Sequence, residues 1–559
     1  MPDTLIYPNG IDAETGAPLL PPLPVELVAG LAQGRPIAKA ELDELRARVA
    51  ELEKQRTAHL GVIAGIDPND LAQAGWGVIF ASEDEAELPA LREALAPLLE
   101  LRRGQAGERY RDETVDPKFL YLPGESMNAW RSRNGGAPGK VDPRRLPYYL
   151  LIVGDPQRIP FDFQYQLDVA HAVGRIHFDT LDEYHSYARS VAAAESPSQP
   201  LALARSAAFF GVRNQFDVAT QLSVQHLVSP LADALSPQLA GWQVQRWLEG
   251  AASKTQLGRL LGGDSTPAFL FSASHGMGFQ YSSSGNPRQR AEQGALICSD
   301  WPGAGPVQRD MQLCAEDIDN DASLLGLIAF FFACFGAGTP QYDDFAISTQ
   351  MQAMLANNQP VSGLEQHDRI PIAPRAFVAK LPQRLLGHPK GGALAVVGHV
   401  DRAWGSSFIW AGARQLATFE SGLTRLLAGE RLGVVIEDFN NRYAELSTEL
   451  TARIQAVKFR EIVPPEELAG LWIANNDARS YVILGDPAVR LAVAGSAAEG
   501  QPRPQIESIT LSPAAAPAGE SKSAAAAPAA PPDPRQAMRA ALEHLEAAVA
   551  ALKAALDQE

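Results

Sequence analysis

The chain has 559 residues and a mass of 60.0 kDa, more than one ordinary hydrophobic core holds, so we expect several structural units. Its 48 Lys and Arg against 65 Asp and Glu give a formal charge of −17, and an acidic chain of this kind is poorly suited to binding nucleic acid or an anionic membrane. Three cysteines exclude a disulfide framework, and the lack of a secretory leader or of an apolar run of about 20 residues predicts a cytoplasmic protein.

The first part of the chain, residues 1–74, is predicted to be an irregular arm followed by a heptad helix. The arm is rich in Pro and Gly, and the stripe that marks the helix recurs at steps of three, four and three residues. It consists of Leu42, Leu45, Val49 and Leu52.

Two α/β units are expected between residues 75 and 495, because short apolar strands alternate with helical stretches. A smaller subdomain spans 75–200 and a larger domain spans 201–495. Their expected strands cover residues 75–81, 148–155, 171–178, 206–212, 268–276, 294–300, 326–338, 393–404 and 481–491. Such strands, apolar on both faces, are typical of a largely parallel sheet between helical layers, which is a three-layer α/β/α sandwich.

The C-terminal part is predicted to be a tethered helix. Residues 496–534 are an Ala- and Pro-rich linker with too few large side chains to fold, and residues 535–559 carry a regular heptad stripe. A helix of about three heptads needs a partner in water. It packs on the 41–55 helix of its own chain, or it mediates self-association or binding of an activating partner, or it is a disordered tail.

His275 and Cys334 are the residues that best suit catalysis. Each follows an apolar strand, FLFSAS or LIAFFFA, and parallel strands place their ends at one edge of a sheet. An imidazole beside a thiol can accept the thiol proton and later protonate a leaving amine. The backbone N–H groups of Gly276 and of Cys334 itself are candidates for an oxyanion hole. Each residue alone also fits an ordinary buried position; the pair, each with Gly nearby, favours catalysis.

These strand ends belong to a run of motifs that resembles caspase-fold cysteine peptidases of clan CD, especially the CHAT branch. The motifs are SHG (274–276), GALIC (294–298), LCAEDI (313–318), FFFACFGAG (330–338) and GHVDRAW (398–404). The flanking segments YLLIVGD (149–155), AVGRI (172–176) and YVILGDPAVRL (481–491) look more like gingipain-type peptidases, in which an α/β subdomain precedes the caspase-like one.

The resemblance implies a cysteine endopeptidase with His275 as general base and acid, Cys334 as nucleophile, a thioester acyl-enzyme and neither metal nor organic cofactor. It further implies a regulated bacterial-type protease, in the manner of caspase-fold effectors of defence or cell death. Two departures stand out. The Glu-Thr-Gly that follows a CHAT-type Cys is here Phe335-Gly336-Ala337, and the secretory signal and propeptide of gingipains are not seen.

Specificity is the least determined property, because many clan CD enzymes bind Arg or Lys in an acidic pocket. Carboxylates near predicted strand ends, and one Trp as a wall, are the candidates for that pocket. They are Asp168, Asp179, Asp343, Asp344, Asp401 and Trp404. The basic loop YSSSGNPRQR (281–290), with Arg288 and Arg290, is a candidate for self-processing or a plain surface loop. The repeated Gly-Asp-Pro at 154–156 and 485–487 is expected to end strands, with a cation such as Ca²⁺ as the alternative.

Two other functions remain open from the sequence. One is a non-catalytic caspase-fold scaffold or interaction protein, although that function would not require both members of the dyad. The other is an amidase or transpeptidase that forms the same thioester with a different substrate or acceptor. The expected partners are thus a protein or peptide substrate and an activating protein or second copy, with no nucleic acid and no membrane.

Overall fold

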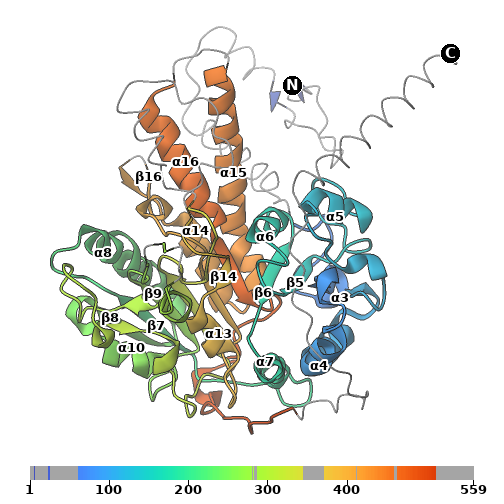
Figure 1. The fold of residues 1–559 in the computed structure, drawn as a ribbon, viewed down its shortest axis with the longest axis horizontal. Helices are drawn as coiled ribbons and strands as arrows, with labels where there is room; N and C mark the ends of the chain where they lie inside the picture. Colours follow the sequence, from blue (N-terminus) through green and yellow to red (C-terminus); the bar gives the residue numbers. More distant parts are fainter. Residues whose placement is uncertain are drawn as a thin grey trace, which may run out of the picture. The chain divides into compact units, whose positions relative to one another are not determined.

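The computed structural model describes residues 61–279, 281–282, 286–343, 371–410, 412–458 and 463–511, together with the paired dipeptides β1 (Leu5–Ile6) and β2 (Leu23–Pro24) (Figure 1). The helix expected over 41–55, most of the 496–534 linker and the helix expected over 535–559 lie outside these described residues, and those predictions stand as they were.

One sheet of ten strands forms the framework, in the order β4-β3-β5-β6-β18-β15-β12-β9-β7-β8. In chain order the strands are β3 (Trp76–Phe80), β4 (Tyr110–Arg111), β5 (Tyr149–Val153), β6 (Ala172–Ile176), β7 (Ser206–Gly211), β8 (Gln243–Leu248), β9 (Phe269–Ala273), β12 (Ile328–Phe332), β15 (Ala395–His399) and β18 (Tyr481–Gly485). All neighbours are parallel except β15 and β18, so the sheet is a mostly parallel one made of two oppositely directed halves.

Besides the pair β1 and β2, three two-stranded ribbons lie outside the main sheet in the described part of the chain. They are β10 (Leu296–Ile297) with β11 (Gln312–Leu313), β13 (Gly338–Thr339) with β14 (Phe377–Val378), and β16 (Ile409–Trp410) with β17 (Ala413–Arg414). The strand expected over 294–300 is therefore two residues long and belongs to a ribbon, because the chain turns there before it can join the sheet.

Helices cover both faces of the sheet. The main ones are α4 (Leu88–Ala106), α5 (Met127–Arg133), α6 (Phe161–Asp168), α7 (Leu181–Ala194), α8 (Val218–Ser223), α9 (Ser229–Leu235), α10 (Lys254–Leu260), α13 (Lys380–Leu386), α14 (Ala417–Leu427), α15 (Leu432–Lys458) and α16 (Pro465–Arg479), with the short helices α3 (Leu71–Ala74) and α11 (Gln289–Glu292) and the π-helical turn η4 (Val224–Val228). Successive residues of β5 enter different hydrophobic clusters. Leu150 and Ile152 join Trp130 of α5 and Phe163 of α6, whereas Leu151 belongs to the cluster that contains α4 and α7.

The second half of the sheet is covered by aromatic packing. The ring of Phe330 in β12 lies 5.9 Å from Phe419 of α14 and 5.7 Å from Phe439 of α15. Helices α15 and α16 run side by side in Figure 1 and share a small core that includes Leu450 and Leu471. The α/β fold with helices on both faces is thus confirmed.

The sheet is continuous across the boundary expected at residue 201. Strand β18, from the end of the part expected over 201–495, lies between β15 and β6, the last strand of the first part. Asp486, directly after β18, strengthens this join because its carboxylate accepts hydrogen bonds from Trp76 Nε1 at 2.9 Å and from the fully buried Arg102 Nε at 2.6 Å. The second Gly-Asp-Pro therefore connects β18 to the first part, and residues up to Leu511 pack as one compact unit.

Candidate active site

The strands that carry His275 and Cys334 are direct neighbours. Strands β9 and β12 are parallel, and Ala273 pairs with Phe332 at their carboxyl ends. His275 and Cys334 each follow that pair by two residues, so they leave the sheet at the same level. The two segments remain hydrogen-bonded for one residue beyond β9, because Ser274 N donates to Phe332 O at 3.2 Å.

Gly276 lies directly against the backbone of Cys334. A Cβ atom added to Gly276 would come 1.7 Å from the carbonyl oxygen of Cys334, a distance that no side chain tolerates. Glycine is thus required because another backbone approaches at this position. Among the described residues, neither the N–H of Gly276 nor that of Cys334 has a hydrogen-bond acceptor. Two neighbouring N–H groups of this kind suit an oxyanion.

The turn after Cys334 is held by the segment that follows β15. Phe335 N donates to Asp401 O at 2.7 Å, and Ala337 N donates to His399 O at 2.8 Å. Phe335 has a φ of +58° and Asp401 a φ of +77°, a left-handed conformation that is uncommon outside glycine. Strained residues of this kind tend to cluster at functional sites, where the surrounding structure holds them in place.

Asp217 is a functional candidate that the sequence analysis missed. Its Oδ2 lies 3.0 Å from Nε2 of His275, and the same side chain caps α8 by accepting the N–H of Thr220 at 2.7 Å. Burial alone would raise the pKa of Asp217, but the hydrogen bonds from Thr220 and the nearby His275 hold it below its ordinary value. Asp217 is therefore an ionised partner for the imidazole. An Asp just before an expected helix was the available signal, and it indicates a helix cap rather than catalysis.

The contact with Asp217 assigns the two nitrogens of His275. A carboxylate only accepts hydrogen bonds, so Nε2 carries the proton and the lone pair of a neutral ring is on Nδ1. Nδ1 is then the atom that can accept the thiol proton of Cys334. Trp301 packs edge-on at 6.0 Å between ring centroids and limits the movement of the imidazole.

The thiol of Cys334 is half-buried and protonated at rest. Burial raises its pKa, while the nearby Arg402 guanidinium opposes that rise. Its Sγ lies 3.9 Å from the carbonyl oxygen of Ala403, within the range of a weak sulfur hydrogen bond. The thiol thus needs a base before it can attack a carbonyl. Cys298 and Cys314 are buried elsewhere, and burial raises the pKa of both.

Arg402 changes the interpretation of the acidic pocket. Its guanidinium contacts the carboxylate of Asp343, lies 3.5 Å from Asp401 Oδ1 and stacks over the ring of Phe335 at 5.9 Å. Asp343 and Asp401 are thus near Cys334 in the fold, but a cation of the chain itself compensates their charge. Trp404 is in the same segment, where its backbone N–H donates to Asp477 Oδ1 at 3.0 Å.

The other predicted pocket residues do not join this group. Asp168 is buried, accepts the N–H of Val173 at 3.1 Å, and has a pKa raised well above its ordinary value by burial. Asp179 is exposed and forms ion pairs with Lys380 at 2.7 Å and Arg290 at 3.3 Å. Asp344 lies outside the described residues.

The predicted processing loop is only partly described. Arg288 forms an ion pair with Glu292 at 2.6 Å and lies over the ring of Phe279, and Arg290 is within α11. Within the described residues, no group of three or more His, Cys, Asp or Glu is placed to hold a metal ion, and no helix is long and apolar enough to span a membrane.

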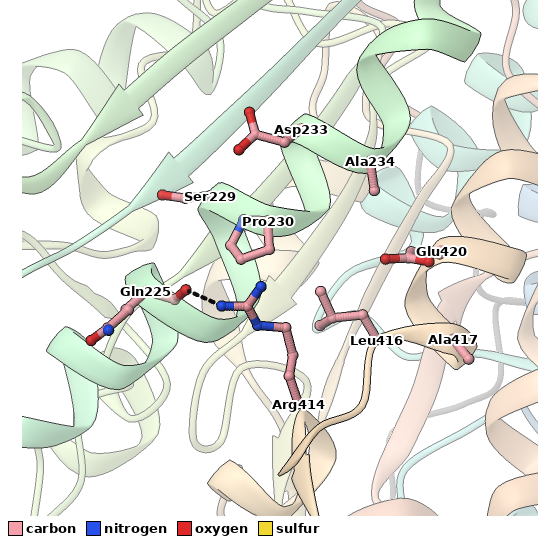
Figure 2. Close-up of a pocket in the computed structure, with 9 residues that line it drawn as sticks. All are labelled: Gln225, Ser229, Pro230, Asp233, Ala234, Arg414, Leu416, Ala417 and Glu420. Carbon is pink, nitrogen blue, oxygen red and sulfur yellow. Dashed lines mark hydrogen bonds between the residues drawn. The ribbon is translucent and has the colours of Figure 1, made fainter.

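A separate cavity of about 630 Å³ lies between α9, η4 and the segment after β17 (Figure 2). It is lined by Gln225, Ser229, Pro230, Asp233, Ala234, Arg414, Leu416, Ala417 and Glu420. In Figure 2 Arg414 reaches across to donate to the carbonyl oxygen of Gln225, at 3.4 Å. Neither His275 nor Cys334 lines this cavity, which distinguishes it from the candidate active site.

No family model and no curated protein matches the sequence. Among solved structures, the chain is similar to the Arg-specific cysteine proteinase gingipain R, with 11% identity over 75% of this chain and 78% of that one and a TM-score of 0.41. The complex of the pro- and mature domains of RgpB from Porphyromonas gingivalis gives 12% identity over 76% and 81%, with a TM-score of 0.40. The separase–securin complex of Saccharomyces cerevisiae gives 8% over 61% and 16%, with a TM-score of 0.29. With TM-scores below 0.5, this likeness assigns no activity to the chain.

Proposed function

We propose that the chain is a cysteine endopeptidase that hydrolyses peptide bonds with Cys334 as nucleophile and His275 as general base and acid. One observation carries this proposal: His275 and Cys334 each stand two residues after the last paired residues of the neighbouring parallel strands β9 and β12. Gly276 contacts the backbone of Cys334 at the same place. Asp217 is added as the residue that positions the imidazole.

The reaction begins when Nδ1 of His275 accepts the thiol proton as Sγ of Cys334 bonds to the scissile carbonyl carbon. The N–H groups of Gly276 and Cys334 stabilise the oxyanion. The imidazolium then donates its proton to the departing nitrogen, the C–N bond breaks, and a thioester remains. Water attacks the thioester and gives one proton to His275, which returns it to the sulfur as the C–S bond breaks. The enzyme is restored and a carboxylic acid leaves.

The surface beside Asp217 is the proposed contact for the substrate. Phe216 and Val218, which flank Asp217, are 67% and 68% exposed. Large apolar side chains this exposed next to a catalytic group suit the apolar side chains of a bound peptide. The expected preference for Arg or Lys before the cut is not carried into the proposal, because Arg402 compensates the nearest carboxylates. The proposal also includes that the peptidase acts inside the cell and that a partner or self-association controls its activity.

The test is a mass-spectrometric cleavage profile of a diverse peptide pool with the wild type, Cys334→Ala and His275→Ala. Cleavage by the wild type alone supports the peptidase and identifies the residue before the cut. Cleavage that survives in Cys334→Ala refutes the assignment. If none of the three cleaves, a thiol-reactive peptide probe is added with and without candidate activators. Labelling that requires Cys334 and His275 indicates a latent enzyme, and no labelling favours the scaffold.

The same experiment separates hydrolysis from acyl transfer. An amine nucleophile added to the pool is incorporated at the new carboxyl terminus if the thioester prefers an amine acceptor to water. Products with only free carboxyl ends agree with the proposed hydrolysis, and amine adducts in excess would make the protein a transpeptidase.

A further inference from the structure

A second, smaller cavity of about 210 Å³ lies far along the chain from the proposed catalytic residues, beside α5. Its lining comes from the end of α5, the turn after it and the residue before β6. The lining residues are Arg131, Gly135, Gly136, Ala137, Lys140, Val141, Asp142, Arg145, Leu146 and His171. None of them belongs to the candidate active site.

Among the described residues, Arg131 is a buried cation without a carboxylate partner. The residue is only 5% exposed. Its Nη2 donates to the carbonyl oxygens of Ala137, at 2.6 Å, and of Gly139, at 3.4 Å. Within the described part of the chain no acidic group pairs with it, and its Nε has no acceptor. Burial lowers the pKa of Arg131, which shows the cost of holding this charge. A buried charge that the protein does not neutralise calls for a counterion.

His171 provides an atom of the opposite polarity. It is 1% exposed, and its Nδ1 lies 2.9 Å from the carbonyl oxygen of Pro147. A carbonyl only accepts, so Nδ1 carries the proton and Nε2 presents a lone pair. Burial, together with the nearby Arg131, lowers the pKa of His171 to about 3, so the ring is neutral at pH 7. Among the described residues Nε2 has no donor.

The remaining charges around the cavity are mostly positive. Lys140 is half-buried and Arg145 is exposed, and neither forms an ion pair with a described residue. Asp142 is the acidic member of the lining; Arg144 engages it at 2.7 Å, and the hydrogen bond from Arg144, with the nearby charge of Arg145, lowers its pKa. Arg131, Lys140 and Arg145 thus give this small cavity a net positive charge, although the whole chain has a formal charge of −17.

We propose that this cavity binds a phosphate group, either as inorganic phosphate or as the end of a small phosphate monoester. Arg131, Lys140 and Arg145 supply donors and positive charge for the phosphate oxygens. Inorganic phosphate at neutral pH also keeps a P–O–H group, which can donate to Nε2 of His171, whereas a monoester, with a second pKa of about 6, is mostly the dianion and is held by the cations alone. Sulfate and carboxylates have no such proton at pH 7. The volume corresponds to roughly seven waters, so the phosphate fits inside and the rest of an ester extends outward.

The experiment is isothermal titration calorimetry of the full-length protein at pH 7 and constant ionic strength. Inorganic phosphate, glycerol phosphate and sulfate are the three ligands. We expect saturable binding of phosphate, with sulfate at least about tenfold weaker because the contact with His171 is lost. A tighter value for glycerol phosphate identifies an ester as the ligand, and a tighter value for inorganic phosphate identifies the free anion.

Charge-reversal variants locate the binding. Lys140→Glu combined with Arg145→Glu is expected to weaken phosphate binding by at least about tenfold, since two of the three cations are replaced by anions. Lys118→Glu, an exposed site outside the cavity, is the matched control for the single variant Arg145→Glu and should stay within about twofold of the wild type. The single variant Arg145→Glu is the fallback if the double variant does not fold. The proposal is overturned if the wild type shows no saturable phosphate binding, if sulfate binds equally well, or if the cavity variants bind like Lys118→Glu.

Discussion

Asp217→Asn tests whether the carboxylate positions the catalytic imidazole or only caps a helix. Asn is as good an N-cap as Asp, so the hydrogen bond to the N–H of Thr220 survives and α8 stays in place. What is lost is the negative charge 3.0 Å from Nε2 of His275. Because both side chains are partly exposed, at 31% for His275 and 18% for Asp217, we assign about 1.5–3 kcal/mol to this charge-assisted contact.

That energy acts on the step in which His275 becomes an imidazolium, so kcat/KM should fall by about 10–150-fold. The assay uses the best peptide from the cleavage profile, with the melting temperature of each variant measured in parallel. Asp70→Asn is the matched control, because Asp70 caps α3 by accepting the N–H of Ala72 at 2.9 Å and is distant in the chain from His275. A kcat/KM of Asp217→Asn within about twofold of the wild type, with an unchanged melting temperature, would leave Asp217 with the helix cap alone.

Three further changes have directions set by the structure. Gly276→Ala adds a Cβ 1.7 Å from the carbonyl oxygen of Cys334, so it should abolish cleavage and cost about 1–3 kcal/mol of stability in chemical denaturation, whereas Gly104→Ala, with no atom near the added Cβ, should cost nothing. Arg402→Met removes the cation that opposes the raised pKa of Cys334, so iodoacetamide should alkylate that thiol more slowly at pH 7; an unchanged rate contradicts the assignment. Burial raises the pKa of Glu437 to about 7, above its ordinary 4.5, so wild-type stability falls as pH rises between those values; Glu437→Gln should remove this loss and gain about 2–3 kcal/mol over the wild type at pH 8 but little at pH 5.

The central strands were predictable because both of their faces are buried. The apolar run expected over 326–338 contains β12 (Ile328–Phe332), and that expected over 268–276 contains β9 (Phe269–Ala273). The edge strand β8 (Gln243–Leu248) was missed, since its residues QVQRWL are partly exposed and polar and carry no continuous apolar signal. A run of apolar residues indicates a strand that is buried on both faces, and an edge strand such as β8 is only partly buried.

The order of the strands could not be predicted from local pattern. Strand β18 (Tyr481–Gly485) lies beside β6 (Ala172–Ile176), about three hundred residues earlier in the chain, and it is also the antiparallel neighbour of β15. The buried contact between Arg102 and Asp486 that accompanies this pairing joins residues 384 positions apart. Nothing in either segment alone identifies the other, because a parallel neighbour leaves no turn signal in the sequence.

The site was predictable to the extent that it follows strands. His275 and Cys334 come directly after long apolar runs, where chemistry-bearing residues are expected. Asp217 was missed because it lies six residues beyond the end of β7, after a loop that the pattern does not describe. The compensation of Asp343 and Asp401 by Arg402 was also unpredictable, since the three residues meet only in the folded chain.

The three proposed catalytic side chains follow three adjacent strands, β12, β9 and β7, in the order Cys334, His275 and Asp217. All three strands run parallel and are buried, and neighbouring strands are about 4.8 Å apart. The sheet therefore brings the thiol and the imidazole to one edge, the N-terminus of α8 places the carboxylate beside the imidazole, and the side chains themselves add little to the core. It follows that Cys334→Ala, His275→Ala and Asp217→Asn should each leave the denaturation midpoint within about 1 kcal/mol of the wild type while removing or reducing cleavage. A large loss of stability in Cys334→Ala or His275→Ala would instead show that the pair belongs to the structural core, as expected of a scaffold.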